Sequence, residues 1–292
     1  MTEKYLENFL SHYWKTYRAM IDNRHGSPAA YDIGDEAFQS KVVEVLPKRE
    51  SLRILGIGSG QGELDCVIMR RLLTRVSRID NTVVEPSTDA MEVYKFLNSK
   101  DLSNQVSTTW YQETFQEYQT RRERSGATDK FHFIGVVHSL YYADKDGSSI
   151  GYLVDLLEDD GVLFIVVEND ESGLISFSRK IKECFGPENS NPTQDYFTSK
   201  VVKLLDDDGR VTYDIVKSHY EIDVTACFDA ESSEGSLIFD FLTHVVDCKS
   251  TVSKYFLKSL LDHLKSPDCS NVLTDGRIIM RHDWDVIIIR KK

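Results

Sequence analysis

Apolar and polar residues are grouped along the chain in blocks that predict strands and helices in turn. Apolar runs of strand length begin with SLRILGI and recur as RIDNTVVE, NQVSTTWY, KFHFIGVVHS and GVLFIVVEN. Segments with apolar residues at helical spacing separate them, and the last of these, SSIGYLVDLLEDD, is expected to end at Gly161. Five strand–helix alternations are typical of a doubly wound parallel sheet. The pattern therefore predicts an α/β fold.

The regions on either side of this alternation have other patterns. Residues 4–21 and the segment that ends at Pro47 have apolar residues at helical spacing. After residue 170, helical and strand-like stretches mix without regular order, and the chain ends in RIIMRHDWDVIIIRKK, which reads as strand with a polar break. No repeat or long linker separates these regions, so we expect them to cover the sheet rather than to form a separate unit.

Glycines are concentrated directly after the first apolar run, in ILGIGSGQGELD (residues 54–65). Each glycine loses much backbone entropy on folding, so this cluster indicates a backbone that something must approach closely. In an open α/β sheet, such a turn lies at the carboxyl ends of the strands, where ligands bind. Glu63 at the start of the next helix disfavours a pyrophosphate, because it cancels the positive end of the helix dipole. S-adenosylmethionine carries no phosphate and has an ammonium group, so it is the cofactor we expect.

A second acidic residue supports a nucleoside ligand. Glu85, in VVEPS, ends the next predicted strand, where a carboxylate can accept hydrogen bonds from both ribose hydroxyls. Many methyltransferases also have an acid two residues before the first motif glycine, a place that Gly56 takes here. The glycine spacing, Glu85 and the alternating pattern together favour a methyltransferase, with Gly56 as a departure from the general motif.

Composition excludes several other classes. The net charge of -12 argues against a nucleic-acid surface, because phosphate binding needs clustered Lys and Arg. Five scattered cysteines without a C-x-x-C pair suit a reducing compartment and give no zinc spacing. No apolar run approaches the ~20 residues that span a membrane, and the acidic N-terminal segment is not a signal peptide. We expect a cytoplasmic protein without a bound metal.

The chain resembles the histamine N-methyltransferases of animals from Lys4 to Ile289. The resemblance follows the order and spacing of ILGIGSGQGELD, VVEPS, WYQETFQEYQ, SLYYADKD and FDFLT, and that family also lacks the acid at the position of Gly56. It implies a monomeric, single-domain, Rossmann-like class I methyltransferase with a mixed seven-stranded sheet and helices on both faces. Residues 1–292 would then comprise an N-terminal helical lid (1–47), a cofactor-binding core (48–170) and substrate-covering insertions with the last strands (171–292).

The resemblance also implies a cofactor site. It assigns the methionine end of S-adenosylmethionine to the glycine loop, the ribose to Glu85, and the adenine to the segment after the third strand. The expected cofactor-binding residues are Gly58, Ser59, Gly60, Gly62, Glu85, Pro86, Thr114, Phe115 and Val137.

On the acceptor side, the aromatic positions of the family are kept better than the polar ones. Arg18 stands where the family has a glutamate that faces a cationic substrate, His138 replaces a glutamine, and His282 replaces an asparagine. A family cysteine falls on Gln194. The expected acceptor-binding residues are Tyr5, Phe9, Arg18, His138, Tyr141, Tyr142, Gln194, Phe241 and His282.

The chemistry of methyl transfer gives these residues possible roles. Aromatic faces attract a sulfonium by about 0.5–2 kcal/mol each, and histidine titrates in the range of a general base. Tyr142, His138 and His282 are therefore the catalytic candidates, although either histidine could instead make a structural hydrogen bond. Arg18, unless it faces solvent, favours an acceptor with a carboxylate. Histamine is the first candidate acceptor. A carboxylate-bearing imidazole or amine, such as a histidine derivative or dipeptide, and a non-catalytic cofactor-binding homologue are the alternatives.

Overall fold

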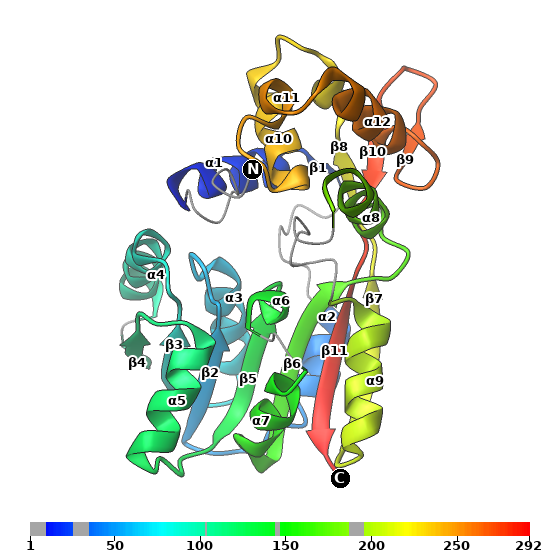
Figure 1. Ribbon diagram of the computed structural model, residues 1–292. Helices are drawn as coiled ribbons and strands as arrows, with labels where there is room; N and C mark the ends of the chain where they lie inside the picture. The colour runs from blue at the N-terminus through cyan, green and yellow to red at the C-terminus, as the bar shows by residue number, and fades with distance from the viewer. Residues whose placement is uncertain (1–9, 26–34, 103, 144–146, 187–195) are drawn as a thin grey trace. The chain divides into compact units, whose positions relative to one another are not determined.

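The computed structural model describes residues 10–25, 35–102, 104–143, 147–186 and 196–292. The chain divides into two compact units, each built from three segments (Figure 1). Met1–Ala30, Glu168–Thr198 and Lys217–Trp284 form the α-rich unit, whereas Tyr31–Val167, Ser199–Val216 and Asp285–Lys292 form the sheet unit. The single-domain prediction with its lid, core and covering ranges stays a prediction. Within the described ranges, every helix is too short or too polar to cross a membrane.

A seven-stranded sheet forms the centre of the sheet unit. Its spatial order is β4 (Val106–Tyr111), β3 (Arg78–Val84), β2 (Ser51–Ile57), β5 (Phe131–Val137), β6 (Leu157–Glu168), β11 (Trp284–Lys291) and β7 (Val211–Ser218). The strands from β4 to β6 pair in parallel, and Figure 1 shows β11 running opposite to β6. The chain winds from β2 outward to β4 and then returns to β5 on the other side of β2. The predicted mixed seven-stranded sheet is confirmed.

Helices before, between and after the parallel strands cover the sheet. They are α2 (Asp35–Phe38) with the π-helix Gln39–Val43, α3 (Glu63–Leu72), α4 (Thr88–Asp101), α5 (Phe115–Ser125), α6 (Leu140–Ala143), α7 (Ser149–Asp155) and α9 (Thr198–Asp208). In Figure 1, α5 and α7 lie on one face of the sheet, and α2 and α3 on the other. The side chain of Ser87 accepts a hydrogen bond from the amide of Ala90, so Ser87 is the N-cap of α4.

One predicted boundary is wrong. Helix α7 ends at Asp155 and β6 begins at Leu157, so the segment LEDD belongs to a strand rather than to the end of a helix. Leu157 is fully buried and pairs with Phe131 of β5, whereas the next pair joins Phe133 to Val162. The sheet register therefore shifts within this segment. Its acidic run resembles a solvated helix end, and the pairing with β5 overrides that local pattern.

The α-rich unit contains a four-stranded antiparallel sheet and a set of helices. The strand order is β1 (Arg24–His25), β8 (Glu221–Asp223), β10 (Ile278–Arg281) and β9 (Ser270–Val272). The helices are α1 (Leu10–Asp22), α8 (Gly173–Phe185), a 3-10 helix (Thr225–Phe228), α10 (Ser233–Thr243), α11 (Cys248–Thr251) and α12 (Lys254–Leu264). Phe177, Phe239 and Leu242 are fully buried in the core of this unit. The polar break predicted near the C-terminus is the junction between β10 and β11.

Candidate functional site

The glycine loop joins β2 to α3 in a conformation that side chains resist. Gly58, Gly60 and Gly62 have φ angles of 62°, 56° and 74°, in the left-handed region. A Cβ on Gly58 would lie 2.5 Å from Cβ of Ser139, and one on Gly62 would lie 2.1 Å from the ring of Tyr94. Both the backbone conformation and the packing therefore require glycine at these places. The sequence motif thus corresponds to a tight turn at the carboxyl end of β2.

Glu85 is tied directly to this loop. It follows β3, and one carboxylate oxygen accepts a hydrogen bond from the amide of Gly60 and the other from the amide of Ser87, both at 2.8 Å. Burial raises the pKa of Glu85, and the two amide hydrogen bonds oppose the rise. The amides fix the orientation of the carboxylate beside the loop. A fixed carboxylate next to a glycine turn is an arrangement that can hold the hydroxyls of a nucleoside.

The other expected cofactor residues lie at the ends of neighbouring strands. Pro86 is exposed after β3, and Val137 is the last residue of β5. Thr114 follows β4 and caps α5 in a capping box with Glu117, while Phe115 is buried behind it. Because β2, β3, β4 and β5 are parallel neighbours, their carboxyl ends share one edge of the sheet. The structure therefore brings all nine predicted cofactor residues to this edge.

Three of the predicted acceptor residues belong to the same edge. His138 follows β5 with a φ of 47°, and its amide donates to the carbonyl of Val166 at 3.0 Å. Tyr141 and Tyr142 lie on the short helix α6, with ring centroids 4.7 Å apart. The side chain of Tyr142 is exposed. The hydroxyl of Ser139 donates to the carbonyl of Ile57 at 2.6 Å, which joins this turn to β2.

The remaining described acceptor candidates lie in the α-rich unit. Arg18 is an exposed residue of α1. Phe241 lies on α10, and its ring packs 6.1 Å from that of Tyr13 and 6.0 Å from that of Tyr17. Three further candidates, Tyr5, Phe9 and Gln194, lie outside the described residues.

His282 occupies an enclosed position between β10 and β11. Its Nε2 lies 3.1 Å from Oε1 of Glu168, and both side chains are only 4% exposed. Glu168 also accepts a hydrogen bond from the hydroxyl of Ser172, and the ring of His282 meets Trp284 edge-on. This arrangement is the structural hydrogen bond that the sequence left open for His282. Its predicted catalytic role stays a prediction.

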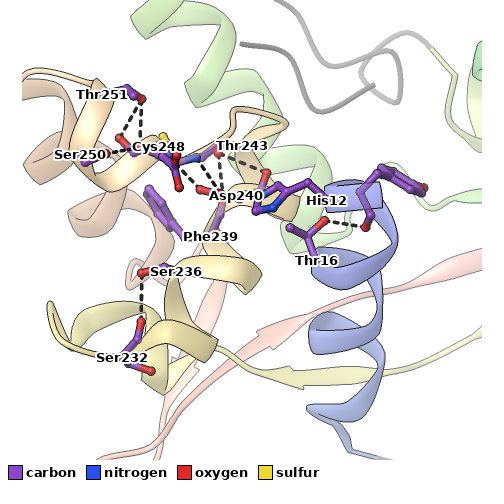
Figure 2. Close-up of polar contacts among 12 residues, drawn as sticks. His12, Thr16, Ser232, Ser236, Phe239, Asp240, Thr243, Cys248, Ser250 and Thr251 are labelled. Carbon is purple, nitrogen blue, oxygen red and sulfur yellow. Dashed lines mark hydrogen bonds and ion pairs between the residues drawn. The ribbon is translucent and has the colours of Figure 1, made fainter. Parts of the chain in front are cut away.

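A polar network that the sequence did not reveal holds α1 to α10 (Figure 2). The buried carboxylate of Asp240 faces Nε2 of His12 at 3.0 Å and accepts hydrogen bonds from the amides of Asp247 and Cys248. Burial raises the pKa of Asp240, and the bond from His12 opposes the rise. Because Phe241 is the next residue, this network positions its ring against α1.

Asp65 is the other residue that sequence reasoning missed. It lies in the first turn of α3, and burial raises the pKa of its carboxyl to about 6. A perturbed acid beside a ligand loop is a candidate for a functional group. Gly56 is the sequence signal that points to Asp65, because a glycine on β2 leaves space that a side chain from α3 can fill.

Comparison with known proteins shows similarity over nearly the whole chain. No protein-family model matches. The chain is 28% identical to a histamine N-methyltransferase of Danio rerio, over 95% of this chain and 94% of that protein. It is 26% identical to a histamine N-methyltransferase of Cavia porcellus, over 95% of this chain and 94% of that protein. It is also 26% identical to carnosine N-methyltransferase 2 of Gallus gallus, over 94% of this chain and 85% of that protein.

Solved structures support the fold. The YcgJ protein of Bacillus subtilis aligns with a TM-score of 0.55 at 15% identity, over 86% of this chain and 96% of that one. A protein described as a methyltransferase from Bacillus halodurans aligns with a TM-score of 0.56 at 14% identity, over 86% and 97% of the two chains. The chain is therefore histamine N-methyltransferase-like in sequence and has the class I methyltransferase fold, as expected.

Proposed function

We propose that this chain is an S-adenosylmethionine-dependent N-methyltransferase that acts on a small molecule with an imidazole or amine nitrogen. The observation that carries this proposal is the pairing of Glu85 with the Gly58–Gly62 loop at one sheet edge. Similarity to N-methyltransferases of histamine and carnosine over nearly the full length supports it.

The residues at this edge fit the cofactor. The loop glycines permit the tight left-handed turn at the carboxyl end of β2, and Glu85 presents a carboxylate whose orientation is already fixed by two amides. When bound, S-adenosylmethionine supplies a methyl group on a positively charged sulfur. Glu85 would accept the ribose hydroxyls, and Tyr141 and Tyr142 would offer aromatic faces to positive charge.

Methyl transfer forms a bond from the acceptor nitrogen to the methyl carbon as the carbon–sulfur bond breaks. The protein contributes by aligning the two reactants and by excluding water. An imidazole is largely neutral at pH 7, since its ordinary pKa is near ~6.5, so its nitrogen needs alignment rather than a strong base. We propose His138 as the residue that takes up a proton from a protonated amine acceptor, because it directly follows β5 and precedes the two tyrosines of α6.

A second candidate is an acceptor that also carries a carboxylate. One observation favours it: one of the relatives is named for carnosine. Arg18 on α1 is exposed, so it would contribute only if its guanidinium reaches the acceptor. A guanidinium pairs with a carboxylate through charge-assisted hydrogen bonds, which would favour a histidine-containing acid or dipeptide over a diamine. The non-catalytic alternative predicts cofactor binding without any product.

We also propose a monomer that works in the cytoplasm. The monomer is supported by the family resemblance. The location is supported by the cysteines, because all five are free in the structure and four of them are buried.

Turnover with labelled S-adenosylmethionine tests the proposal. The acceptors would be histamine, a β-alanyl-histidine dipeptide and histidine, each assayed for kcat/KM. We expect methylation of at least one, with loss of activity in Glu85→Gln. Cofactor binding without methylation of any imidazole or amine in the panel would instead favour the non-catalytic alternative.

A further inference from the structure

We propose that Asp65 provides the anionic group that binds the ammonium of the cofactor's methionine end, by reaching from α3 into the space beside Gly56 of β2. This inference deepens the proposed function and rests on it. It also assigns a reason to the departure at Gly56, where many methyltransferases place an acid.

The geometry around Gly56 carries the first step. A Cβ added to Gly56 would lie 2.7 Å from Oδ2 of Asp65 and 2.4 Å from Oγ of Ser59, closer than packed atoms approach. The carboxylate of Asp65 therefore fills the space into which a side chain at position 56 would project. An acid on the strand and the acid on the helix exclude each other, and this chain has the second.

The surroundings hold the Asp65 carboxylate in that space. The hydroxyl of Tyr94, from the buried face of α4, donates to Oδ2 of Asp65 at 3.1 Å. The same Tyr94 ring packs against Gly62 and excludes a side chain there. One aromatic residue thus fixes both the glycine turn and the acid beside it. The acid is held in place before any ligand binds, which lowers the entropic cost of binding.

The hydroxyl of Ser59 adds a second observation. Ser59 lies between Gly58 and Gly60 in the loop, and its Oγ is near enough to lower the pKa of Asp65. Its geometry nevertheless leaves this buried oxygen without a well-formed hydrogen bond among the described residues. Buried polar atoms are normally paired, so this hydroxyl is positioned for a ligand group at the same place.

The charge balance identifies the class of ligand group. Glu85 lies close enough to Asp65 for the negative charge of Asp65 to raise its pKa. In the described part of the chain, no lysine or arginine is among the groups that shift the pKa of either carboxyl. Two desolvated acids with no cation among these groups favour a positively charged partner. The ammonium of an amino acid chain attached to a nucleoside meets that requirement, with the ribose at Glu85.

A comparison of two ligands isolates this role. S-adenosylhomocysteine carries the ammonium, whereas 5′-methylthioadenosine has the same adenosine without the amino acid. Calorimetric titration of Asp65→Asn should show S-adenosylhomocysteine binding weakened by about tenfold to a hundredfold, as for a lost charge-assisted bond. The affinity for 5′-methylthioadenosine should stay within about twofold of the wild-type value. Asp89→Asn, at an exposed acid in the first turn of α4, is the matched control and should change neither affinity.

A rescue and a milder variant complete the test. The double variant Gly56→Asp with Asp65→Gly returns the acid to the strand and should recover part of the lost S-adenosylhomocysteine affinity. If Asp65→Asn does not fold, Tyr94→Phe decides, because it removes only the hydroxyl and should weaken S-adenosylhomocysteine alone by about threefold. Equal effects on both ligands, or no effect, in the folded variants would overturn the role of Asp65. Wild-type protein that binds neither ligand would overturn the proposed function as well.

Discussion

The carboxyl edge of the seven-stranded sheet and the set of acceptor candidates differ in how they are built. All nine predicted cofactor residues come from consecutive strand ends of one unit. The six described acceptor candidates come from both units, and one of them, His282, is enclosed by its own partners. The cofactor residues are specified by backbone turns and strand ends, which have regular spacing in a sequence. The acceptor candidates are side chains from distant segments, where a single substitution changes the chemistry of the site.

The largest effect should come from the glycine turn. Gly62→Ala places a Cβ 2.1 Å from the ring of Tyr94 and also requires a left-handed conformation. Overpacking and backbone strain together predict a loss of about 2–5 kcal/mol in the free energy of unfolding. Urea denaturation measures it. Gly126→Ala is the control, since Gly126 has a similar φ with nothing near its Cβ position, and should cost about 1–2 kcal/mol. Equal losses would contradict the packing argument.

The next largest effect concerns the ribose. Glu85→Gln exchanges one carboxylate oxygen for an amide group that cannot accept a hydrogen bond. We expect S-adenosylhomocysteine and 5′-methylthioadenosine to lose about tenfold to a hundredfold in affinity, and by the same factor, because both contain the ribose. Calorimetry of the two ligands measures this. A loss confined to S-adenosylhomocysteine would place Glu85 at the amino acid end instead.

Two histidine variants sharpen the comparison between the regions. His282→Ala removes one hydrogen-bond partner of the buried Glu168 and should lower the free energy of unfolding by about 1–3 kcal/mol. His138→Asn keeps a residue type that tolerates the left-handed conformation, so we expect normal stability with kcat reduced about tenfold or more for an amine acceptor. Thermal melts and steady-state kinetics on both proteins measure these outcomes. The reverse pattern would exchange the roles of the two histidines.

The affinity for the cofactor should depend on pH through Asp65. Its pKa is about 6 in the free protein, so below that pH the carboxyl is protonated and must lose its proton to pair with an ammonium. The affinity for S-adenosylhomocysteine should therefore be constant above about pH 7 and fall by up to tenfold per pH unit below about 6. Glu85, whose pKa is also raised, adds to the loss at lower pH. Asp65→Asn should show a flatter profile, and an unchanged profile in that variant would assign the dependence to another group.

The smallest effect concerns acceptor charge. Arg18→Glu should raise KM for a carboxylate-bearing acceptor by about threefold to tenfold and leave histamine unchanged or improved, as expected for an exposed charge pair. Lys15→Glu, an exposed position on the same helix, serves as the control for a general charge effect. Identical KM changes for the two variants would remove Arg18 from the acceptor site.

Much of the fold could be predicted because strand and helix periods are local. The glycine turn follows from a residue type with strong conformational preferences, and Glu85 follows from its place at the end of a predicted strand. The error at Leu157–Asp160 arose because a polar run at a helix end looks the same as one in a strand held by a buried neighbour. Pairing with a neighbouring strand decides between helix and strand, and the sequence of one segment does not reveal that pairing.

The missed and uncertain site residues share one cause. Asp65 acts across a helix and a strand that meet at Gly56, and His12 meets Asp240 across two helices that are far apart in the sequence. The partner of His282, Glu168, lies 114 positions away in the sequence. Each of these depends on a contact between distant segments, which residue spacing does not encode.

The central claim is that the sheet edge binds a nucleoside with a charged amino acid chain and no phosphate. Calorimetric titration of the wild-type protein with S-adenosylhomocysteine and, separately, with NAD⁺ tests it most directly. We predict one S-adenosylhomocysteine bound per chain and no measurable binding of NAD⁺, because Glu63 and Asp65 occupy the helix start that a pyrophosphate would need. Binding of NAD⁺ in preference to S-adenosylhomocysteine would contradict the account.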